Sequence, residues 1–423
     1  MMRSERKVAL MLLLLLGGAT VLHVYGGGLQ SGVPSARAIG LGGTSSALTG
    51  DPTTLFSNGA SLSFLHGTNL TLGATVTVPD YEFSGVLPSA ATTKMQPQSL
   101  FPPAISLSHT FATGLGIGFT ASIPYYTKTN WGVDWVGSHV VTASEIRGVQ
   151  LSPTVAFRIG SHLAAGIGLQ AVFVRMDHGR TIGSLPDPQT GRFPTMAMTG
   201  SADVAYSFDL GLMYSPGADF ALALSLRGRT TAEISNGTVT YSADVVESSE
   251  AGPTTSTFAT TVTLPERIRA GVMLRPFHGL LLTGEADLTR WSSMRGMTVR
   301  IGSPAVVRIV DQAGWKDVFS YRAGVELGLS DVMIRAGAGY EASPIPDADL
   351  RPSIPDANCF HFGFGLGYAV EEGLLLDLGV QIDRYADRTI TNSSVLSSFN
   401  EYLNGTYRLS STIVALTISY SWK

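Results

Sequence analysis

The sequence has few charged residues, a single cysteine and, beyond about its first 25 residues, no long hydrophobic run. Charged residues make up 14% of the 423 positions, against about 25% in soluble domains, so a soluble chain of this composition would struggle to cover its surface. A hydrophobic content of 44% excludes a disordered chain, because such chains are poor in apolar residues. The absence of a run near the ~20 apolar residues of a spanning helix argues against a helical membrane protein. A transmembrane β-barrel remains, because it places its apolar residues at alternate positions.

The signals of catalysis and of metal binding are also missing. One thiol, Cys359, excludes an intramolecular disulfide and a cysteine-based zinc site, and we predict no special role for it. The eight histidines are scattered without metal-binding spacing, and no nucleophile elbow occurs. A net charge of −4 gives no electrostatic case for nucleic acid. We therefore predict no enzyme activity, cofactor, metal or nucleic-acid partner.

The amino terminus has the anatomy of a secretory signal peptide. Basic residues precede an apolar run over 8–16, and Val24-Tyr25-Gly26 offers a cleavage site. The alternative is a single membrane anchor. We predict a signal peptide over residues 1–26 and, with it, export; the scarcity of cysteine fits an oxidising periplasm.

The rest of the chain reads as hairpins. Apolar residues alternate with small or polar ones over 204–214, 360–368 and 374–382, which is the period of a strand with one greasy face. Short turns alternate strictly with long polar loops, near 80–102, 127–146, 179–198, 236–256, 297–313, 343–356 and 388–407. Seven long loops and six short turns predict fourteen strands over residues 69–423. An even strand number with short turns at one end and long loops at the other is typical of all-β outer-membrane barrels.

Residues 27–68 differ from the barrel in composition. They are rich in Gly, Ser and Thr, have no clean period, and still contain too many apolar residues for a linker. They form either a loose leader or a plug folded inside the lumen, and we favour the plug. We predict three parts: a signal peptide over 1–26, an amino-terminal hatch over 27–68, and a barrel over 69–423.

Several blocks of sequence, in order, resemble the outer-membrane long-chain fatty acid transporter family of the FadL/TodX type. They are Gly27 to Gln30 with Ser35 to Gly40, the segment from Asp51 to Ala60, the block 264–276 with the acidic and Trp-containing stretch that follows it, and the block 315–358 with its two Pro-Asp motifs. The resemblance covers essentially the whole mature chain. It implies a fourteen-stranded antiparallel barrel with an amino-terminal hatch in the lumen, in a Gram-negative-type outer membrane. It also implies passive uptake of hydrophobic molecules, which leave sideways through an opening in the wall near a kinked strand.

The chain departs from the family pattern at the hatch motif. The family has Asn-Pro-Ala, whereas this chain has Asn58, Gly59 and Ala60. Because Gly is more permissive than Pro, the hatch is expected to be looser or its turn different. The last residue, Lys423, also follows the aromatic residue on which such proteins usually end.

Four arginines are candidates for pairing with the carboxylate of a fatty acid. Arg267, Arg269, Arg322 and Arg335 share the lumen-facing parity of their strands, opposite to the apolar residues. The alternative is a structural ion-pair network that fills a barrel too wide for apolar packing, in which each arginine is already satisfied.

Further substrate-binding candidates lie at the start of the mature chain and at the base of a long loop. The resemblance places Leu29 at the family's mature start, and Trp131 and Trp135 lie where a strand rises into a loop. The two tryptophans form either a landing surface for acyl chains or part of the outer aromatic girdle.

Four functions stay open on sequence grounds. The leading one is uptake of long-chain fatty acids; uptake of aromatic hydrocarbons, a structural or assembly role without transport, and a general porin are the others. The expected partners are hydrophobic small molecules, outer-membrane lipid and lipopolysaccharide, and the barrel assembly machinery, and the chain is expected to be a monomer.

Overall fold

The computed structural model describes residues 30, 32, 34–87, 90–182, 191, 193–242, 255–294, 296–302, 307–311, 314–396 and 402–422, with the backbone alone over 307–311. The predicted signal peptide and Leu29 lie outside the described residues. The domain boundaries predicted at residues 26 and 68 stay predictions.

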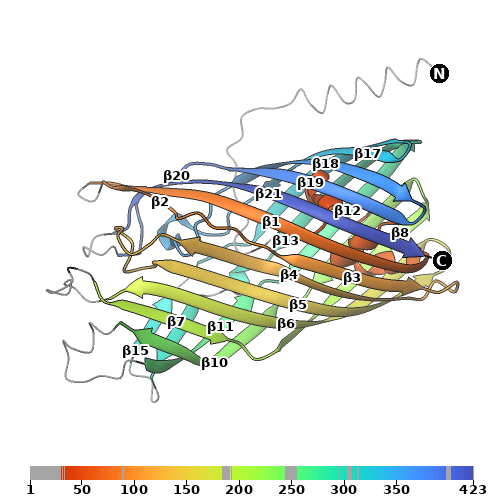
Figure 1. The fold of residues 1–423 in the computed structure, drawn as a ribbon. Coiled ribbons are helices and arrows are strands. Elements are labelled where there is room, and N and C mark those ends of the chain that lie inside the picture. Colours follow the sequence, from red (N-terminus) through yellow and green to blue (C-terminus); the bar gives the residue numbers. More distant parts are fainter. Residues whose placement is uncertain are drawn as a thin grey trace.

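The strands of the described chain form one closed antiparallel barrel (Figure 1). Its first and last strands, β1 (Gly67–Gly85) and β21 (Gly405–Trp422), pair from Thr68–Trp422 to Gly85–Gly405. Fourteen strands make the wall in the described part of the chain, so the fold predicted from the loops is confirmed.

Nine wall strands are continuous and five are built from two pieces in line. The continuous ones are β1, β3 (Pro103–Thr110), β4 (Gly116–Asn130), β5 (Ala143–Ile159), β6 (Leu163–Thr181), β17 (Val332–Glu341), β18 (Cys359–Glu371), β19 (Leu374–Tyr385) and β21. The divided ones are β7 (Thr195–Ser201) with β8 (Ala205–Gly217), β9 (Phe220–Arg227) with β10 (Thr230–Tyr241), β11 (Thr255–Leu264) with β12 (Arg267–Phe277), β13 (Leu280–Thr289) with β14 (Met297–Ile301), and β15 (Val307–Asp311) with β16 (Val318–Leu329). Short strands β2 (Thr92–Lys94) and β20 (Arg388–Ile390) pair antiparallel with the outer ends of β1 and β21.

The alternation read from the sequence sets which face of each strand meets lipid. In β18, Phe360, Phe362 and Phe364 are exposed on the outer surface, whereas His361 and the glycines between them face the lumen. A soluble protein would bury such a face, so its exposure around the wall is that of a lipid-facing band. The end with the short turns and the C-terminus is the periplasmic end by the usual orientation of such barrels, and the other is called the outer end below.

Several segments that the sequence predicts as loops are structured. The predicted loop over 297–313 contains the hairpin β14–β15, and β1 runs on to Gly85 inside the predicted loop over 80–102. These pieces lie beyond the apolar band, where lipid does not demand a greasy outer face. Their outward residues are polar, such as Thr298 and Arg300, and the strand pattern is therefore harder to recognise.

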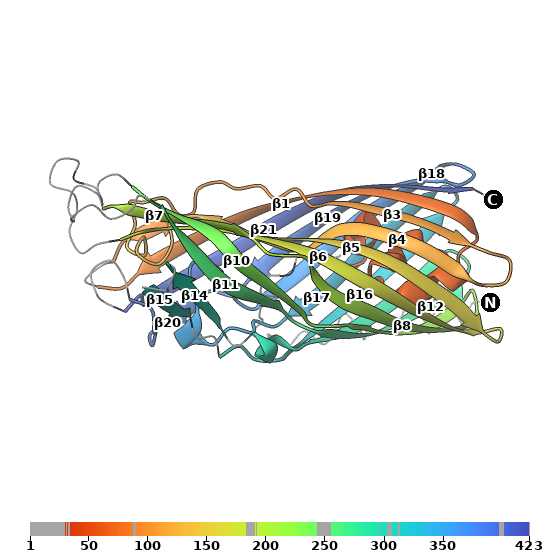
Figure 2. The same cartoon turned by 90° about the horizontal axis from the view of Figure 1, so that it is seen from below.

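The hatch, residues 34–66, lies inside the barrel toward the periplasmic end (Figures 1 and 2). It contains one short helix and two 3-10 turns, α2 (Ala36–Gly40), η1 (Pro52–Phe56) and η2 (Gly59–Phe64). Each begins at a side chain that caps a backbone N–H: Ser35 accepts from Ala38, Asp51 from Thr53, and Asn58 from Ala60. The predicted plug is confirmed as part of the fold.

Lumen-facing glycines form the seat of the hatch. A Cβ at Gly363 would lie 2.0 Å from the Ile39 carbonyl oxygen, and one at Gly379 would lie 2.4 Å from that of Ala36. A Cβ at Gly116 would lie 2.8 Å from Cβ of Leu62. The hatch backbone therefore packs directly on the barrel backbone, which any side chain would prevent.

Candidate functional site

The hatch motif holds η2 against the wall. The Asn58 side chain donates to the carbonyls of Leu212, at 3.1 Å, and Ser46, at 3.3 Å, while its oxygen accepts from the N–H of Ala60 at 3.0 Å. Gly59 occupies the first position of η2, where proline is normally favoured. A Cβ there would lie 2.7 Å from the Thr154 methyl group, so the wall beside it explains why the residue is small.

One ion-pair network ties the hatch to the barrel. The Arg37 guanidinium donates to both carboxylate oxygens of Glu326, at 2.7 and 2.9 Å, and to Asp51 at 3.0 Å. Glu326 also accepts from Arg335 at 2.6 Å, and Arg335 donates to Asp377 at 2.6 Å. Burial by itself would lower the pKa of Arg37, but Glu326 and Asp51 raise it above its ordinary value, so the guanidinium stays charged. The pair is bidentate and almost fully desolvated, which is the strong form of such an interaction.

A second network lies on β12, β13 and β16. Asp287 accepts hydrogen bonds from Arg267, from Arg269 at 2.9 Å and from Arg322. Arg322 also pairs with Glu341. In this network Glu285 touches the hatch, because its carboxylate accepts from the backbone N–H groups of Ser45, at 3.1 Å, and Ser46, at 2.9 Å.

The four predicted arginines thus face the lumen, and each has a carboxylate partner there. The structure brings Arg267, Arg269 and Arg322 together, and places Arg335 in the hatch network. The one with spare capacity is Arg267: its Nε is buried without a hydrogen-bond partner among the described residues.

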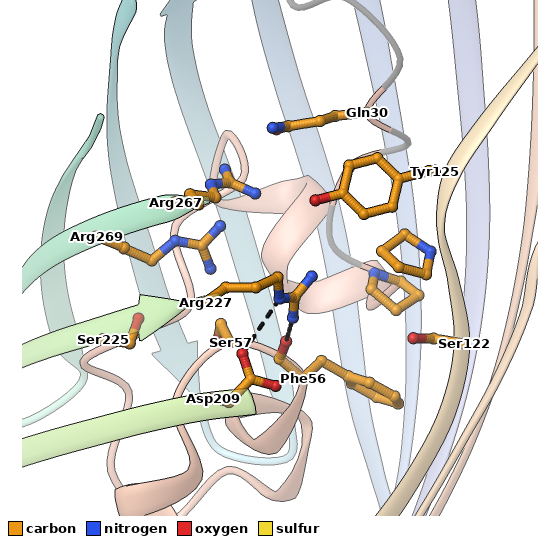
Figure 3. Close-up of a pocket in the computed structure, with 13 residues that line it drawn as sticks. Gln30, Phe56, Ser57, Ser122, Tyr125, Asp209, Ser225, Arg227, Arg267 and Arg269 are labelled. Carbon is orange, nitrogen blue, oxygen red and sulfur yellow. Dashed lines mark hydrogen bonds and ion pairs between the residues drawn. The ribbon is translucent and has the colours of Figure 1, made fainter. Parts of the chain in front are cut away.

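Arg267 and Arg269 line a small cavity of about 50 Å³ together with Arg227, and we call it the arginine pocket (Figure 3). Figure 3 shows the three guanidinium groups converging on a space shared with Tyr125 and Gln30. Arg227 donates to Asp209 at 3.2 Å and to the hatch carbonyl of Phe56 at 3.4 Å. Positive charge exceeds negative in the lining, so the pocket suits an anion.

Sequence reasoning missed both Arg227 and Arg37 as site residues. Arg227 stands at the end of β9, where the strand is interrupted, and the period-2 pattern near a break does not say which way a side chain points. Arg37 was visible only as part of the family's opening block. A lone basic residue within an apolar, Gly-rich segment was the available signal, because a buried charge needs a partner.

Trp131 and Trp135 lie inside the outer end of the barrel. Their rings stack at 5.0 Å between centroids, and only 3% and 7% of their surfaces are exposed. Each indole N–H donates to a backbone carbonyl, of Pro352 at 2.8 Å and of Val141 at 2.9 Å. Neither ring faces lipid, and both belong to the apolar filling of the outer lumen.

A larger cavity, the upper cavity, lies in the outer half of the lumen and has a volume of about 470 Å³. Methionines supply much of its apolar lining, and flexible thioethers adapt to ligands of varied shape. Two arginines, Arg180 and Arg351, also line it beside the imidazole rings of His139 and His178, with one acid, Asp349, among the described lining residues. The Nε of Arg180 is buried and has no hydrogen-bond partner in the described chain. The cavity thus combines an apolar interior with groups that attract a negative charge.

The wall is incomplete between β1 and β4. β3 begins only at Pro103, so β1 beyond Ala74 has no β3 partner, and residues 95–102 cross the gap with a single bridge, Thr77–Leu100. β4 is itself irregular between Ser122 and Tyr125, where Pro124 interrupts the ladder.

A cavity of about 150 Å³, the lateral cleft, runs through this gap. Its lining includes Arg267 and Arg322 in the lumen, the buried residues Thr75 and Pro102 beside the gap, and the partly exposed Tyr126. The cleft therefore extends from the neighbourhood of the arginine pocket to the gap in the wall.

Other kinds of site are not found in the described residues. No group of three or more His, Cys, Asp and Glu is placed there to hold a metal ion, and Cys359 is a buried free thiol. No helix in that part of the chain is both long and apolar enough to cross a bilayer.

Known proteins resemble the chain in sequence and in fold. The long-chain fatty acid transport protein of Salmonella typhi is 22% identical over 280 residues, which are 60% of this chain and 63% of that protein. The protein of the same name from Escherichia coli (strain K12) is 22% identical over 291 residues, 60% of this chain and 64% of its own length. The chain therefore matches less than two thirds of the length of these curated relatives.

Solved structures match almost completely in fold. A Pseudomonas aeruginosa FadL homologue has a TM-score of 0.81 at 15% identity, with 94% of this chain and 100% of that chain covered. The P. putida toluene transporter TodX has a TM-score of 0.71 at 15% identity, with 93% and 99% covered. At such identity the likeness shows the fold alone.

The decisive comparison is with a family model rather than with single relatives. The model of the outer membrane protein transport proteins (OMPP1/FadL/TodX) matches residues 28–422, nearly the whole chain. The resemblance read from the sequence is confirmed, and the chain belongs to this family of outer-membrane transport proteins.

Proposed function

We propose that this protein is an outer-membrane channel for the passive uptake of hydrophobic molecules, and that long-chain fatty acids are its substrates. The observation that carries the proposal is the upper cavity, where an apolar lining meets the guanidinium groups of Arg180 and Arg351. An acyl chain gains about 0.8 kcal/mol for each methylene removed from water. A hydrocarbon has no use for the basic groups, whereas a carboxylate does.

The path is proposed to run from the upper cavity, past the arginine pocket, and out through the lateral cleft. Arg267 lines both the pocket and the cleft, so a carboxylate passing from one to the other stays near a cation. The exit at the gap beside β3 lies above the hatch, and the substrate leaves the lumen sideways into the membrane. The family relatives named for fatty acid transport support the substrate class.

The other functions raised by the sequence make different demands. A general porin needs a wide polar opening, whereas the lumen here holds the hatch and an apolar outer filling. A purely structural barrel has no need of a cavity of about 470 Å³ with a cleft through the wall. Uptake of aromatic hydrocarbons is the second candidate, because the solved relatives include a toluene transporter.

Binding of radiolabelled oleate to the purified protein in detergent tests the proposal, with toluene and short-chain acids as competitors. The matched variants are Arg180→Gln, in the upper cavity, and Arg175→Gln, on the same strand but exposed and paired with Asp177. A charge-assisted hydrogen bond contributes about 1.5–3 kcal/mol, so Arg180→Gln should weaken oleate binding by about tenfold or more. Arg175→Gln should leave it unchanged.

Absence of saturable oleate binding to folded protein would overturn the proposal. Ready displacement of oleate by toluene, together with equal affinities for the two variants, would transfer the assignment to hydrocarbons. The predictions of a monomer and of contacts with lipopolysaccharide and the assembly machinery remain separate predictions, for which this experiment is not designed.

A further inference from the structure

The barrel wall has a second interruption, far around from the lateral cleft. Strands β11 and β14 pair only at Phe258–Ile301 and Ala259–Arg300, and the pairing of β12 with β13 begins at Arg267–Thr289. Between these ladders, residues 260–266, 290–294 and 296–299 have no ladder pairing across the wall in the described chain, and one backbone hydrogen bond crosses there, from the Arg290 N–H to the Glu266 carbonyl at 3.0 Å. The break stands six to seven strands from the gap at β3, almost half-way around the fourteen.

Two hollows meet at this break, one on each side of the wall. The upper cavity reaches it from the lumen, and a hollow of about 800 Å³, which we call the outer hollow, reaches it from outside. The two share three lining residues, Thr261, Thr263 and Gly296. Between the two threonines, Val262 is buried and faces the lumen. A strand paired on both sides would separate the two spaces, whereas here they border on the same short stretch of backbone.

The outer hollow is basic and rich in hydroxyl groups. It is lined by Arg229, Arg290 and Arg300 against one acid, Glu266, with threonines and serines between them. Arg290 pairs with Glu266, while Arg229 and Arg300 have no ion pair among the described residues and are exposed. Two exposed arginines without partners keep their full capacity for an incoming anion.

The hollow stands at the height of the lipid headgroups. A belt of neighbouring aromatic rings crosses the outer ends of β16, β17 and β18, through Phe319, Tyr321, Tyr340, Phe360 and Phe362, with centroids 6.1 to 6.3 Å apart. Such belts mark the membrane–water interface. Phe319 pairs in register with Leu288, so Arg290 lies two residues farther out on the neighbouring strand, just beyond the belt.

We propose that this break is a side entrance, through which single-chain amphiphiles with an anionic headgroup pass from the outer leaflet into the upper cavity. The arginines of the outer hollow hold the headgroup while the chain slides between Thr261 and Gly296 into the apolar lining. This inference rests on the proposed function, because it supplies the same cavity with the same class of ligand. It places an entrance from the membrane on one side of the barrel, in addition to the proposed exit on the opposite side.

The test compares loading from a membrane with binding at equilibrium. Wild type and variants are reconstituted in phospholipid vesicles that contain fluorescent oleate, and the rate at which the cavity fills is followed by stopped-flow mixing. Thr263→Trp and Thr261→Trp each place a large ring in the break. Thr257→Trp is the matched control, because it lies on the same face of the same strand outside both hollows. Equilibrium binding of oleate from detergent shows that each variant is folded and that its cavity is intact.

A side entrance predicts that loading from vesicles slows by about tenfold or more in Thr263→Trp and Thr261→Trp, which corresponds to an added barrier of about 1.4 kcal/mol. Because both threonines also line the upper cavity, the loading rate should fall by more than the equilibrium affinity does, whereas Thr257→Trp should match wild type in both. Equal loading rates in all three variants would overturn the side entrance while leaving the fatty acid function standing. Failure of wild type to bind oleate in detergent would instead overturn the proposed function, and the entrance with it.

A separate experiment tests the role of the arginines in the outer hollow. The double variant Arg229→Gln with Arg300→Gln should slow the loading of oleate severalfold and leave the loading of oleyl alcohol unchanged, because the alcohol carries no charge. Equal slowing of both ligands, or of neither, would contradict a headgroup site in the outer hollow.

Discussion

Glu326→Gln is the substitution expected to loosen the hatch most directly. Glu326 stands on the barrel wall and accepts two hydrogen bonds from Arg37 of the hatch, and it also accepts one from Arg335 of the wall. Glutamine has nearly the same shape, so the packing is kept and only the charge is lost. The change therefore removes one electrostatic tether between the hatch and the barrel and leaves the glycine seat as it is.

The magnitude follows from what remains after the substitution. Removing one partner of a buried ion pair costs about 3–5 kcal/mol, because a buried charge is left uncompensated. Here Arg37 keeps Asp51 and Arg335 keeps Asp377, so the cost lies toward the lower figure. About 3 kcal/mol corresponds to an increase of roughly two orders of magnitude in the population of the displaced hatch.

Single-channel recording in planar bilayers measures that population as brief ion-conducting events. Glu326→Gln should open far more often than wild type. Glu341→Gln is the control, because Glu341 also pairs with a buried lumenal arginine, Arg322, yet makes no ion pair or hydrogen bond to the hatch among the described residues. An opening frequency for Glu326→Gln that equals that of the control would refute the idea that this network holds the hatch.

Two further predictions concern the seat of the hatch and the exit. Gly363→Ala places a Cβ 2.0 Å from the Ile39 carbonyl oxygen, so it should lower the melting temperature and raise the conductance, whereas Gly328→Ala, whose Cβ would have 3.7 Å to its nearest neighbour, should do neither. Ile123→Trp fills the lateral cleft and should abolish oleate uptake by cells while oleate still binds the purified protein; undiminished uptake would place the exit elsewhere.

The fourteen strands could be read from the sequence because lipid imposes a simple rule on the outer surface. Where a strand crosses the apolar band, every second residue is greasy, as Phe360, Phe362 and Phe364 show in β18. Beyond the band this rule no longer applies, and the sequence of the hairpin β14–β15 therefore predicts a loop. The breaks in five wall strands were not predicted, for a related reason. At a residue such as Gly228 the spacing expected of one continuous strand is kept, although the hydrogen-bonded ladder changes its partner strand there.

The arginines show which features of the site the sequence could not predict. Parity within a strand places Arg269 and Arg322 in the lumen, and the structure agrees. Their shared partner, Asp287, depends on the register between β12, β13 and β16, which brings Arg269 and Ser320 level with it on either side. Register is set by turns and packing across strands, and a single sequence does not state it. The same limit hid the meeting of Arg37 with Glu326, which are 289 positions apart.

A barrier and a transport path can share one barrel here because they occupy different parts of it. The hatch closes the axis at the periplasmic half, where it rests on bare backbone and is held by desolvated ion pairs. The proposed path enters at the break beside β14, crosses the upper cavity and leaves at the gap beside β3, all on the outer side of the hatch. A molecule on that path moves from membrane to membrane without displacing Arg37 from Glu326. Loosening the hatch should therefore make the barrel leak ions without speeding the uptake of fatty acids, whereas in a channel along the axis the two would rise together.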